Sequence, residues 1–137
     1  MKLRFVTKKP KHKDYPKELK TLGDHLRKVR LDRGFSQPEV AKILGVVTDT
    51  VTCWELNRNT PTAKFAKKIL EFIGYIPIDW FDAPTHMKLR YVRMITGNTQ
   101  RQLAHQLKCD STVVQKLEAA LRIPNSYVRK LILETFN

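Results

Sequence analysis

The sequence predicts an all-α protein built from two similar helical units. Apolar residues recur at three- and four-residue spacing, as in Leu22, Leu26 and Val29, which is the periodicity of an amphipathic helix. Two capping-box sequences, which start helices, occupy residues 36–39 and 99–102. The second box follows the first by 63 residues, and this interval recurs through the second half of the chain, so the fold is expected to repeat.

A shift of 63 residues aligns the two halves without a gap. The coinciding positions include apolar, glycine and charged residues, so the match is not confined to one residue type. We expect a basic arm at residues 1–20, a helical domain at 21–76, an apolar linker at 77–86 and a second unit at 87–137. The coinciding pairs include Leu26/Leu89, Arg30/Arg93, Gly34/Gly97, Gln37/Gln100, Ala41/Ala104, Leu44/Leu107, Val51/Val114, Glu55/Glu118, Pro61/Pro124 and Ile69/Ile132.

The first unit begins with the helix of Leu22, which Gly34 ends because glycine adopts a left-handed conformation easily. In the second helix the Ser36 hydroxyl accepts from the third helical N–H, and Glu39 reaches back to the start. Pro38 is tolerated in the first turn, where the N–H has no helical partner. Gly45 ends this short helix, whose predicted apolar face consists of Val40, Ala41, Ile43 and Leu44.

A third helix is expected from about Thr48 to Leu56, with Val51 and Trp54 facing inward. Asn57 is expected to close it in a left-handed conformation. A fourth amphipathic helix ends at Gly74, and its predicted apolar face consists of Phe65, Ala66, Ile69, Leu70 and Ile73.

Charge points to a polyanionic partner. The 137 residues contain 26 Lys and Arg against 13 Asp and Glu, a formal net charge of +13. Residues 1–20 hold 8 basic and 2 acidic side chains, and residues 81–137 hold 9 and 4. Neutralising phosphates releases condensed counterions, so this excess favours nucleic acid ahead of a membrane surface.

Two short helices joined by a glycine turn, with a polar face on the second, form a helix-turn-helix. The segments LGDHLRKVRLDRGFSQ, VAKILGV and VTCWELNRNTP, in this order, resemble the Cro/C1 (XRE-type) domain of phage repressors and bacterial regulators. The resemblance covers about residues 21–77. Together with the 63-residue repeat, it implies two tandem lambda-repressor-like helix-turn-helix units. The family usually has Ser or Thr at Val47 and glycine at Asn57. Thr48 is therefore the expected cap of the third helix, which would shift its start by one residue.

The resemblance also implies which side chains contact double-stranded DNA. The third helix would enter the major groove, where Asp49 could accept from a cytosine amino group. Ser36 and Gln37, at a helix N-terminus, suit phosphate contact, and a base is a second possible partner for Gln37. The simpler alternative for each is a solvated surface residue, or for Cys53 a packed one. The predicted DNA-binding set is Ser36, Gln37, Thr48, Asp49, Thr52, Cys53, Asn57 and Arg58.

Arg30 and Glu55 are 25 residues apart, and Arg93 and Glu118 keep the same interval. In the family the matching pair forms a partly buried salt bridge between the first helix and the end of the third. Such a pair would orient the helix that contacts the bases, because breaking it leaves an unpaired buried charge. We predict both pairs as structural salt bridges.

The second unit has a different outer face. Asp110 is expected to cap its third helix, whereas Ala120 and Leu121 replace Asn57 and Arg58. These replacements, with Leu117, predict an apolar patch suited to packing or dimerisation instead of phosphate contact. If the units mimic a dimer, one chain would cover two half-sites about one helical turn apart. The possible DNA-binding residues are Thr99, Gln100, Ser111, Thr112, Gln115 and Lys116.

The basic arm has no helical period and is expected to contact phosphates or a neighbouring minor groove. Its alternatives are a solvated tail or a strand LRFVT that pairs with another copy. The linker GYIPIDWFDAPTH is apolar, so we expect it to pack between the units. The arm residues predicted to contact phosphates are Lys8, Lys9, Lys11 and Lys13.

No other class of function has a motif in the sequence. The histidines and cysteines show no metal-ligand spacing, and no glycine-rich phosphate loop is present. We therefore expect a cytoplasmic protein that is not an enzyme and has no cofactor, metal or membrane span. The predicted function is a sequence-specific bacterial or phage transcriptional regulator of the repressor type, as a homodimer or a pseudo-dimer within one chain. Two alternatives are an antitoxin or adaptor with a protein-binding surface, and the DNA-targeting module of a recombination system.

Overall fold

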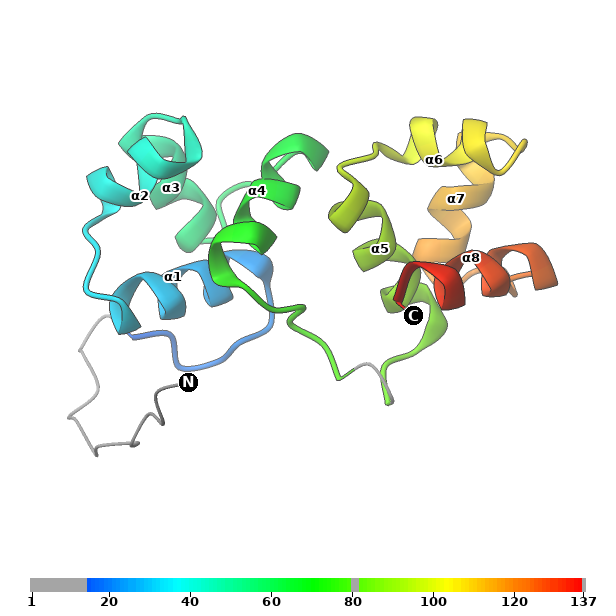
Figure 1. Ribbon diagram of the computed structural model, residues 1–137, viewed down its shortest axis with the longest axis horizontal. Coiled ribbons are helices and arrows are strands. Elements are labelled where there is room, and N and C mark those ends of the chain that lie inside the picture. Colours follow the sequence, from blue (N-terminus) through cyan, green and yellow to red (C-terminus); the bar gives the residue numbers. More distant parts are fainter. Residues whose placement is uncertain (1–14, 80–81, 137) are drawn as a thin grey trace.

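The computed structural model describes residues 15–79 and 82–136, which form eight α-helices and no strands (Figure 1). The first four are α1 (Leu22–Asp32), α2 (Gln37–Leu44), α3 (Thr48–Glu55) and α4 (Ala63–Ile73). The second four are α5 (Thr85–Thr96), α6 (Gln100–Gln106), α7 (Ser111–Glu118) and α8 (Ser126–Phe136). The helices of residues 15–79 and 82–136 are too short or too polar to cross a membrane. The predicted arm contacts Lys8, Lys9, Lys11 and Lys13, the alternative strand LRFVT, and Trp80 and Phe81 of the linker lie outside the described residues.

The two groups of four helices have the same backbone plan. Each helix of the second group begins 63 residues after its counterpart in the first. Positive φ angles recur at the same interval: Gly34 and Gly97 have φ of 74° and 75°. The same angle recurs where the side chain differs, because Asn57 and Ala120 have φ of 57° and 60°. Alanine rarely adopts this conformation, so the backbone of the second group follows the first even against local preference.

Side-chain caps start several of these helices. Both predicted capping boxes are present, at Ser36 with Glu39 and at Thr99 with Gln102. Asp110 caps α7 by accepting from the Thr112 N–H. The prediction that Thr48 caps α3 is wrong: Val47 has the extended cap conformation, the helix begins at Thr48, and no side chain caps it.

Each group of helices encloses its own apolar core. In the first core Leu26, Val40, Val51 and Ile69 are fully buried, and in the second Leu89, Leu103 and Val114 are their counterparts in α5, α6 and α7. One core assignment is wrong, because Ile43 is 53% exposed. The inner face of α2 uses positions 40, 41 and 44, and position 43 lies on its outer side.

The two groups meet at a seam between α4 and α5 (Figure 1). Tyr91 of α5 is only 8% exposed and belongs to the first core, and Met94 and Ile95 pack against the same core. The counterparts of Tyr91 and Ile95 in α1 are the charged residues Lys28 and Asp32. The second group therefore has apolar side chains at the positions where it packs against the first.

This seam joins non-equivalent surfaces. The counterpart of α5 is α1 and the counterpart of α4 is α8, so a two-fold arrangement that pairs α4 with α5 would also pair α8 with α1. The main contact between the halves is α4 with α5, and α1 with α8 is not among the main contacts of the described residues. The two groups are therefore not related as in a two-fold dimer, and the pseudo-dimer within one chain and its half-site spacing stay predictions.

The described apolar residues of the linker pack on the first group. Ile76 and Ile78 lie against the first core, and the Tyr75 hydroxyl lies 2.9 Å from Nδ1 of His25. The linker is also shorter than expected, because α5 begins at Thr85, two residues before the predicted boundary of the second unit.

Candidate nucleic-acid interface

The helix pair α2 and α3 presents the predicted DNA-binding face of the first group. Gly45, with φ of 73°, ends α2, and α3 begins three residues later. Val51 and Trp54 of α3 are buried in the first core. The opposite side of α3 therefore faces outward, with Asp49 exposed and the other three predicted residues, Thr48, Thr52 and Cys53, half-buried.

A buried ion pair fixes the end of α3. The Arg30 guanidinium donates from Nε and Nη2 to the Glu55 carboxylate at 2.7 and 2.8 Å. The Glu55 side chain is 1% exposed and the Arg30 side chain 10% exposed. Arg30 also donates to the Phe35 carbonyl at 3.0 Å, just before α2. This predicted pair therefore ties three helices together at one point.

Gln37 extends this network to the middle of α3. Its Nε2 donates to Glu55 at 3.2 Å, and its Oε1 accepts from the Thr52 hydroxyl at 2.9 Å. The Thr52 hydroxyl also lies 3.2 Å from the Thr48 carbonyl oxygen. The hydroxyl proton of Thr52 is thus engaged within the protein, which leaves its oxygen and its methyl group for a base. Gln37 likewise acts as a bridge between α2 and α3.

Asn57 has a role that differs from its predicted phosphate contact. Its Nδ2 donates to the Asp24 carboxylate at 2.9 Å, and its Oδ1 accepts from the Thr21 hydroxyl at 2.7 Å. The side chain therefore connects the end of α3 to the start of α1. Burial of the Asp24 carboxyl opposes its ionisation, but hydrogen bonds from Asn57 and from the Lys20 and Thr21 N–H groups lower its pKa. Arg58, next along the chain, is exposed and stays in the predicted set.

Sequence reasoning missed the glycine that allows α1 to approach α3. A Cβ atom on Gly23 would lie 2.0 Å from the carbonyl oxygen of Trp54. No side chain fits at this distance, so the closest approach of the two helices depends on glycine. Its position one residue into a helix gives no such signal in the sequence, because the neighbour belongs to a distant segment.

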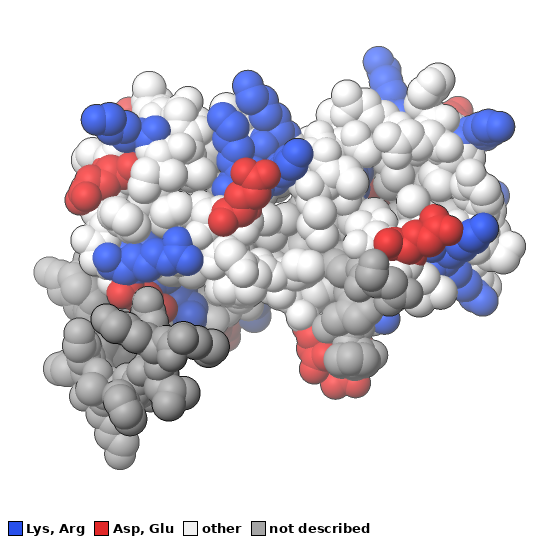
Figure 2. All heavy atoms as spheres, in the orientation of Figure 1, with Lys and Arg blue, Asp and Glu red and all other residues white. Residues whose placement is uncertain are grey.

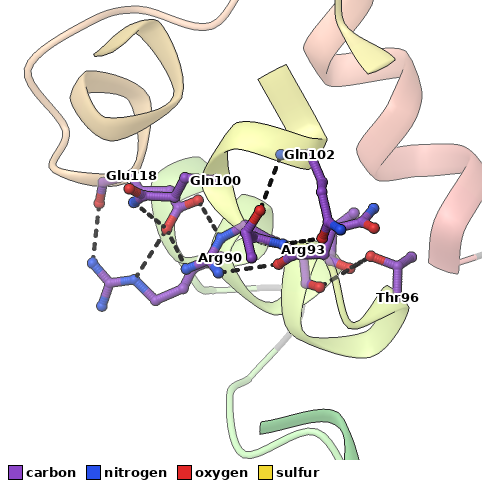
Figure 3. Close-up of polar contacts among 9 residues, drawn as sticks. Arg90, Arg93, Thr96, Gln100, Gln102 and Glu118 are labelled. Carbon is purple, nitrogen blue, oxygen red and sulfur yellow. Dashed lines mark hydrogen bonds and ion pairs between the residues drawn. The ribbon is translucent and has the colours of Figure 1, made fainter. Parts of the chain in front are cut away.

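The second group contains a similar polar network, shown in Figure 3. Arg93 donates from Nε and Nη2 to the Glu118 carboxylate at 2.8 and 3.0 Å, the second predicted pair. Gln100 donates to the same carboxylate at 3.4 Å, as Gln37 does to Glu55. A further arginine, Arg90, donates from Nη2 to the Glu118 backbone carbonyl at 3.2 Å. The orientation of α7 against α5 and α6 is therefore fixed in the same way as that of α3.

The outer face of α7 is more basic than that of α3. Thr112, Gln115 and Lys116 are exposed, and Ser111 is half-buried. A hydrogen bond from the Thr112 N–H lowers the pKa of the Asp110 carboxyl, which caps this helix. Lys116 thus places a positive charge at the position of Cys53.

The loop after α7 exposes apolar side chains. Leu121 is 77% exposed and Ile123 is 82% exposed, where the first group has Arg58 and Thr60. We call these two residues, together with the exposed Tyr127, the apolar patch. Leu117, expected in the patch, is 4% exposed and belongs to the second core.

Further basic side chains lie on α4, which carries Lys64, Lys67 and Lys68. Figure 2 shows lysine and arginine side chains gathered over this helix, between the two groups. Lys68 lies 5.4 Å from the centre of the Phe65 ring. These lysines were not in the predicted set, since the DNA contacts that the resemblance implies lie on α2, α3 and the loop after α3.

The geometry of α1 to α4 agrees with the comparison against protein families. Residues 26–81 match the family described as Helix-turn-helix. The chain contains one Cro/C1-type helix-turn-helix domain. This domain implies DNA as a partner, and no catalytic family is found. The match does not extend into α5 to α8. Neither the curated proteins nor the solved structures contain a match to the chain.

Proposed function

We propose that this protein is a sequence-specific transcriptional regulator that binds double-stranded DNA through α3 of its helix-turn-helix domain. The observation that carries the proposal is the network that links the buried Arg30–Glu55 pair to Gln37 and Thr52. It holds α2 and α3 in one orientation inside the matched domain, while the outer face of α3 stays polar. Repression in the cytoplasm is the form we propose, because the resemblance is to the domain of phage repressors.

The proposed contacts follow from where each side chain lies. Thr48 and Asp49 stand in the first turn of α3, and the N–H groups there have no side-chain cap. Free N–H groups at a helix start suit a phosphate or a base edge. Ser36 and Gln37 occupy the start of α2, and Arg58 follows α3. Thr52 and Cys53 complete the face that would enter the major groove.

We also propose that α5 to α8 form a second, diverged helix-turn-helix unit. Its support is the 63-residue interval between helix starts, the matching φ angles and the second buried pair, Arg93 with Glu118. In this proposal Thr99, Gln100, Ser111, Thr112, Gln115 and Lys116 contact DNA. Because the seam is not two-fold, the DNA site of one chain would be asymmetric, not an inverted repeat.

Selection of bound sequences from random DNA by the full chain tests the proposal. One enriched motif is expected, and each wrong base pair in it should weaken binding by about 1–3 kcal/mol. The absence of any enriched motif would exclude a sequence-specific regulator. Footprints of the full chain and of a Gln100→Ala/Lys116→Ala variant then test the second unit, whose contribution is excluded if footprint length and affinity are both unchanged.

A second candidate function is an adaptor that binds DNA with one unit and a protein with the other. The apolar patch favours it, because large apolar side chains replace the polar loop of the first unit there. A groove of about 420 Å³ adjoins the patch and is lined partly by Tyr127 and Ile123. This function would be supported if a protein co-purifies in stoichiometric amount with wild type but not with Leu121→Ser. If no such protein co-purifies, the regulator is the one remaining candidate function.

A further inference from the structure

A groove of about 470 Å³ lies at the seam between the two groups of helices. One wall consists of the start of α1 and the loop after α3, including Asn59 and Thr60. The other wall consists of α5 and the start of α6, including Arg90 and Gln100. Neither group of helices could form this groove alone.

The groove contains an arginine whose charge is only weakly balanced. Glu118 is the acidic residue in its lining, and its carboxylate already binds Arg93 at 2.8 and 3.0 Å. Nε of Arg90 lies 3.9 Å from the same carboxylate, and the Arg90 side chain is 44% exposed. Arg93 neutralises Glu118, so Arg90 adds a net positive charge to the groove.

Arg90 is also held in place. Its Nη2 donates to the Glu118 backbone carbonyl at 3.2 Å, and Figure 3 shows its side chain extended alongside the Glu118 and Gln100 side chains. A guanidinium fixed by one hydrogen bond keeps further N–H donors for an anion in the groove. An arginine that is positioned before binding loses less side-chain entropy when it binds.

The opposite wall offers neutral donors. Asn59 and Thr60 are exposed, and their side chains make no hydrogen bond to the residues that the structure describes. They directly follow Arg58, a predicted backbone contact of the first unit. Gln100, across the groove, is a predicted contact of the second unit. The groove therefore lies between the proposed DNA-binding surfaces of the two units.

We propose that this groove binds a backbone phosphate of the DNA, with Arg90 as the charged donor and Thr60, Asn59 and Gln100 as neutral donors. The proposal rests on the proposed DNA-binding function. A phosphate held here would contact both units at once and would fix their position on the duplex. It would carry no sequence information of its own.

The test compares Arg90→Gln with a matched control, Arg129→Gln, an exposed arginine on α8 outside the groove. Affinity for the selected site and for unrelated DNA is measured between 50 and 200 mM salt. For Arg90→Gln the slope of log K against log salt should become shallower by about 0.9, on both DNAs alike. For Arg129→Gln the slope should not change. An unchanged slope in Arg90→Gln would overturn the proposal.

Two further variants separate charge from structure. Arg90→Lys should retain the salt slope, because the positive charge is kept, while affinity falls with the loss of the planar donor set. Thr60→Val should weaken binding to both DNAs about equally without changing the slope. If Arg90→Gln lowers the melting temperature, the Arg90→Lys and Thr60→Val results still decide the matter, and full wild-type affinity in both overturns the proposal.

Inorganic phosphate distinguishes a DNA phosphate from a free anion. The probe is the NMR signal of the Arg90 Nε–H group, followed during phosphate addition. The groove would be assigned to a free anion if this signal responds at millimolar phosphate while Arg90→Gln binds DNA as tightly as wild type. That result would overturn the DNA proposal. If wild-type protein binds DNA without sequence preference, the proposed regulator function is excluded. The salt slope of Arg90→Gln still tests the groove in that case, because phosphate contacts are independent of sequence.

Discussion

Replacing Glu55 with alanine should destabilise the helix-turn-helix domain and weaken DNA binding together. The substitution removes two short charge-assisted hydrogen bonds, at 2.7 and 2.8 Å, and leaves the Arg30 charge in a site where its side chain is 10% exposed. Breaking a buried pair in this way costs about 3–5 kcal/mol. The free energy of unfolding of a small domain is about 5–15 kcal/mol, so this cost is a large fraction of the total stability.

The assay is urea unfolding followed by circular dichroism, with Glu134→Ala as the matched control. Glu134 pairs with Lys130 at 3.8 Å on the surface of α8, where both side chains are mostly exposed. That control should lose no more than about 0.5 kcal/mol. A loss below about 1 kcal/mol in Glu55→Ala, with unchanged DNA affinity, would refute the proposed role of the network.

A double replacement, Arg30→Met with Glu55→Leu, separates stability from orientation. Apolar residues of similar volume often replace a buried ion pair without loss of stability, so much of the unfolding free energy should return. DNA affinity should not return, because Gln37 has lost the carboxylate that accepts from its Nε2. Full recovery of DNA affinity would show that the network does not orient α2 and α3.

Three further changes test other parts of the structure. Tyr91→Ala at the seam should lower the free energy of unfolding, measured with urea, by about 3 kcal/mol. Tyr127→Ala in the apolar patch should change it by no more than about 0.5 kcal/mol. Equal effects of the two substitutions would mean that the seam does not stabilise the protein. Gly23→Ala should destabilise the protein clearly more than Gly34→Ala, because its Cβ would meet the backbone of α3, while the cost at Gly34 is about 1–2 kcal/mol from its positive φ. The folded-state pKa of Asp24 is lowered, so its stabilisation is fully present above the ordinary Asp pKa and is lost as pH falls through the lowered value. Melting temperatures between pH 2 and 6 should fall less steeply in Asp24→Asn than in wild type, and parallel curves would contradict this.

Features that depend on local or evenly spaced residues were predictable from the sequence. The capping boxes at Ser36 and Thr99 and the left-handed Asn57 follow from neighbouring residues alone. The 63-residue interval and the two buried pairs followed from spacing, because a repeated backbone places equivalent residues in equivalent contacts.

Features that depend on contacts between distant segments were not predictable. Nothing in the sequence near Tyr91 indicates that it is buried in the first core. The groove that Arg90 lines exists only where the two groups meet, so it was not predictable either. The side chain of Asn57 was expected on DNA because nothing in its own segment indicates Asp24 as a partner. Ile43 was misassigned because an apolar residue near a helix face boundary can lie on either side. Leu117 was misassigned although its counterpart Trp54, predicted to face inward, is buried as well.

The central claim, that α3 contacts the base edges, is tested most directly by repeating the selection from random DNA with Asp49→Asn. A carboxylate accepts from the cytosine amino group, whereas asparagine pairs with the N6 and N7 atoms of adenine. The wild-type motif should therefore contain a cytosine that the variant replaces with adenine at one position, with the rest of the motif unchanged. An identical motif from both proteins would contradict the claim, because the exposed side chain in the first turn of α3 would then have no part in sequence recognition.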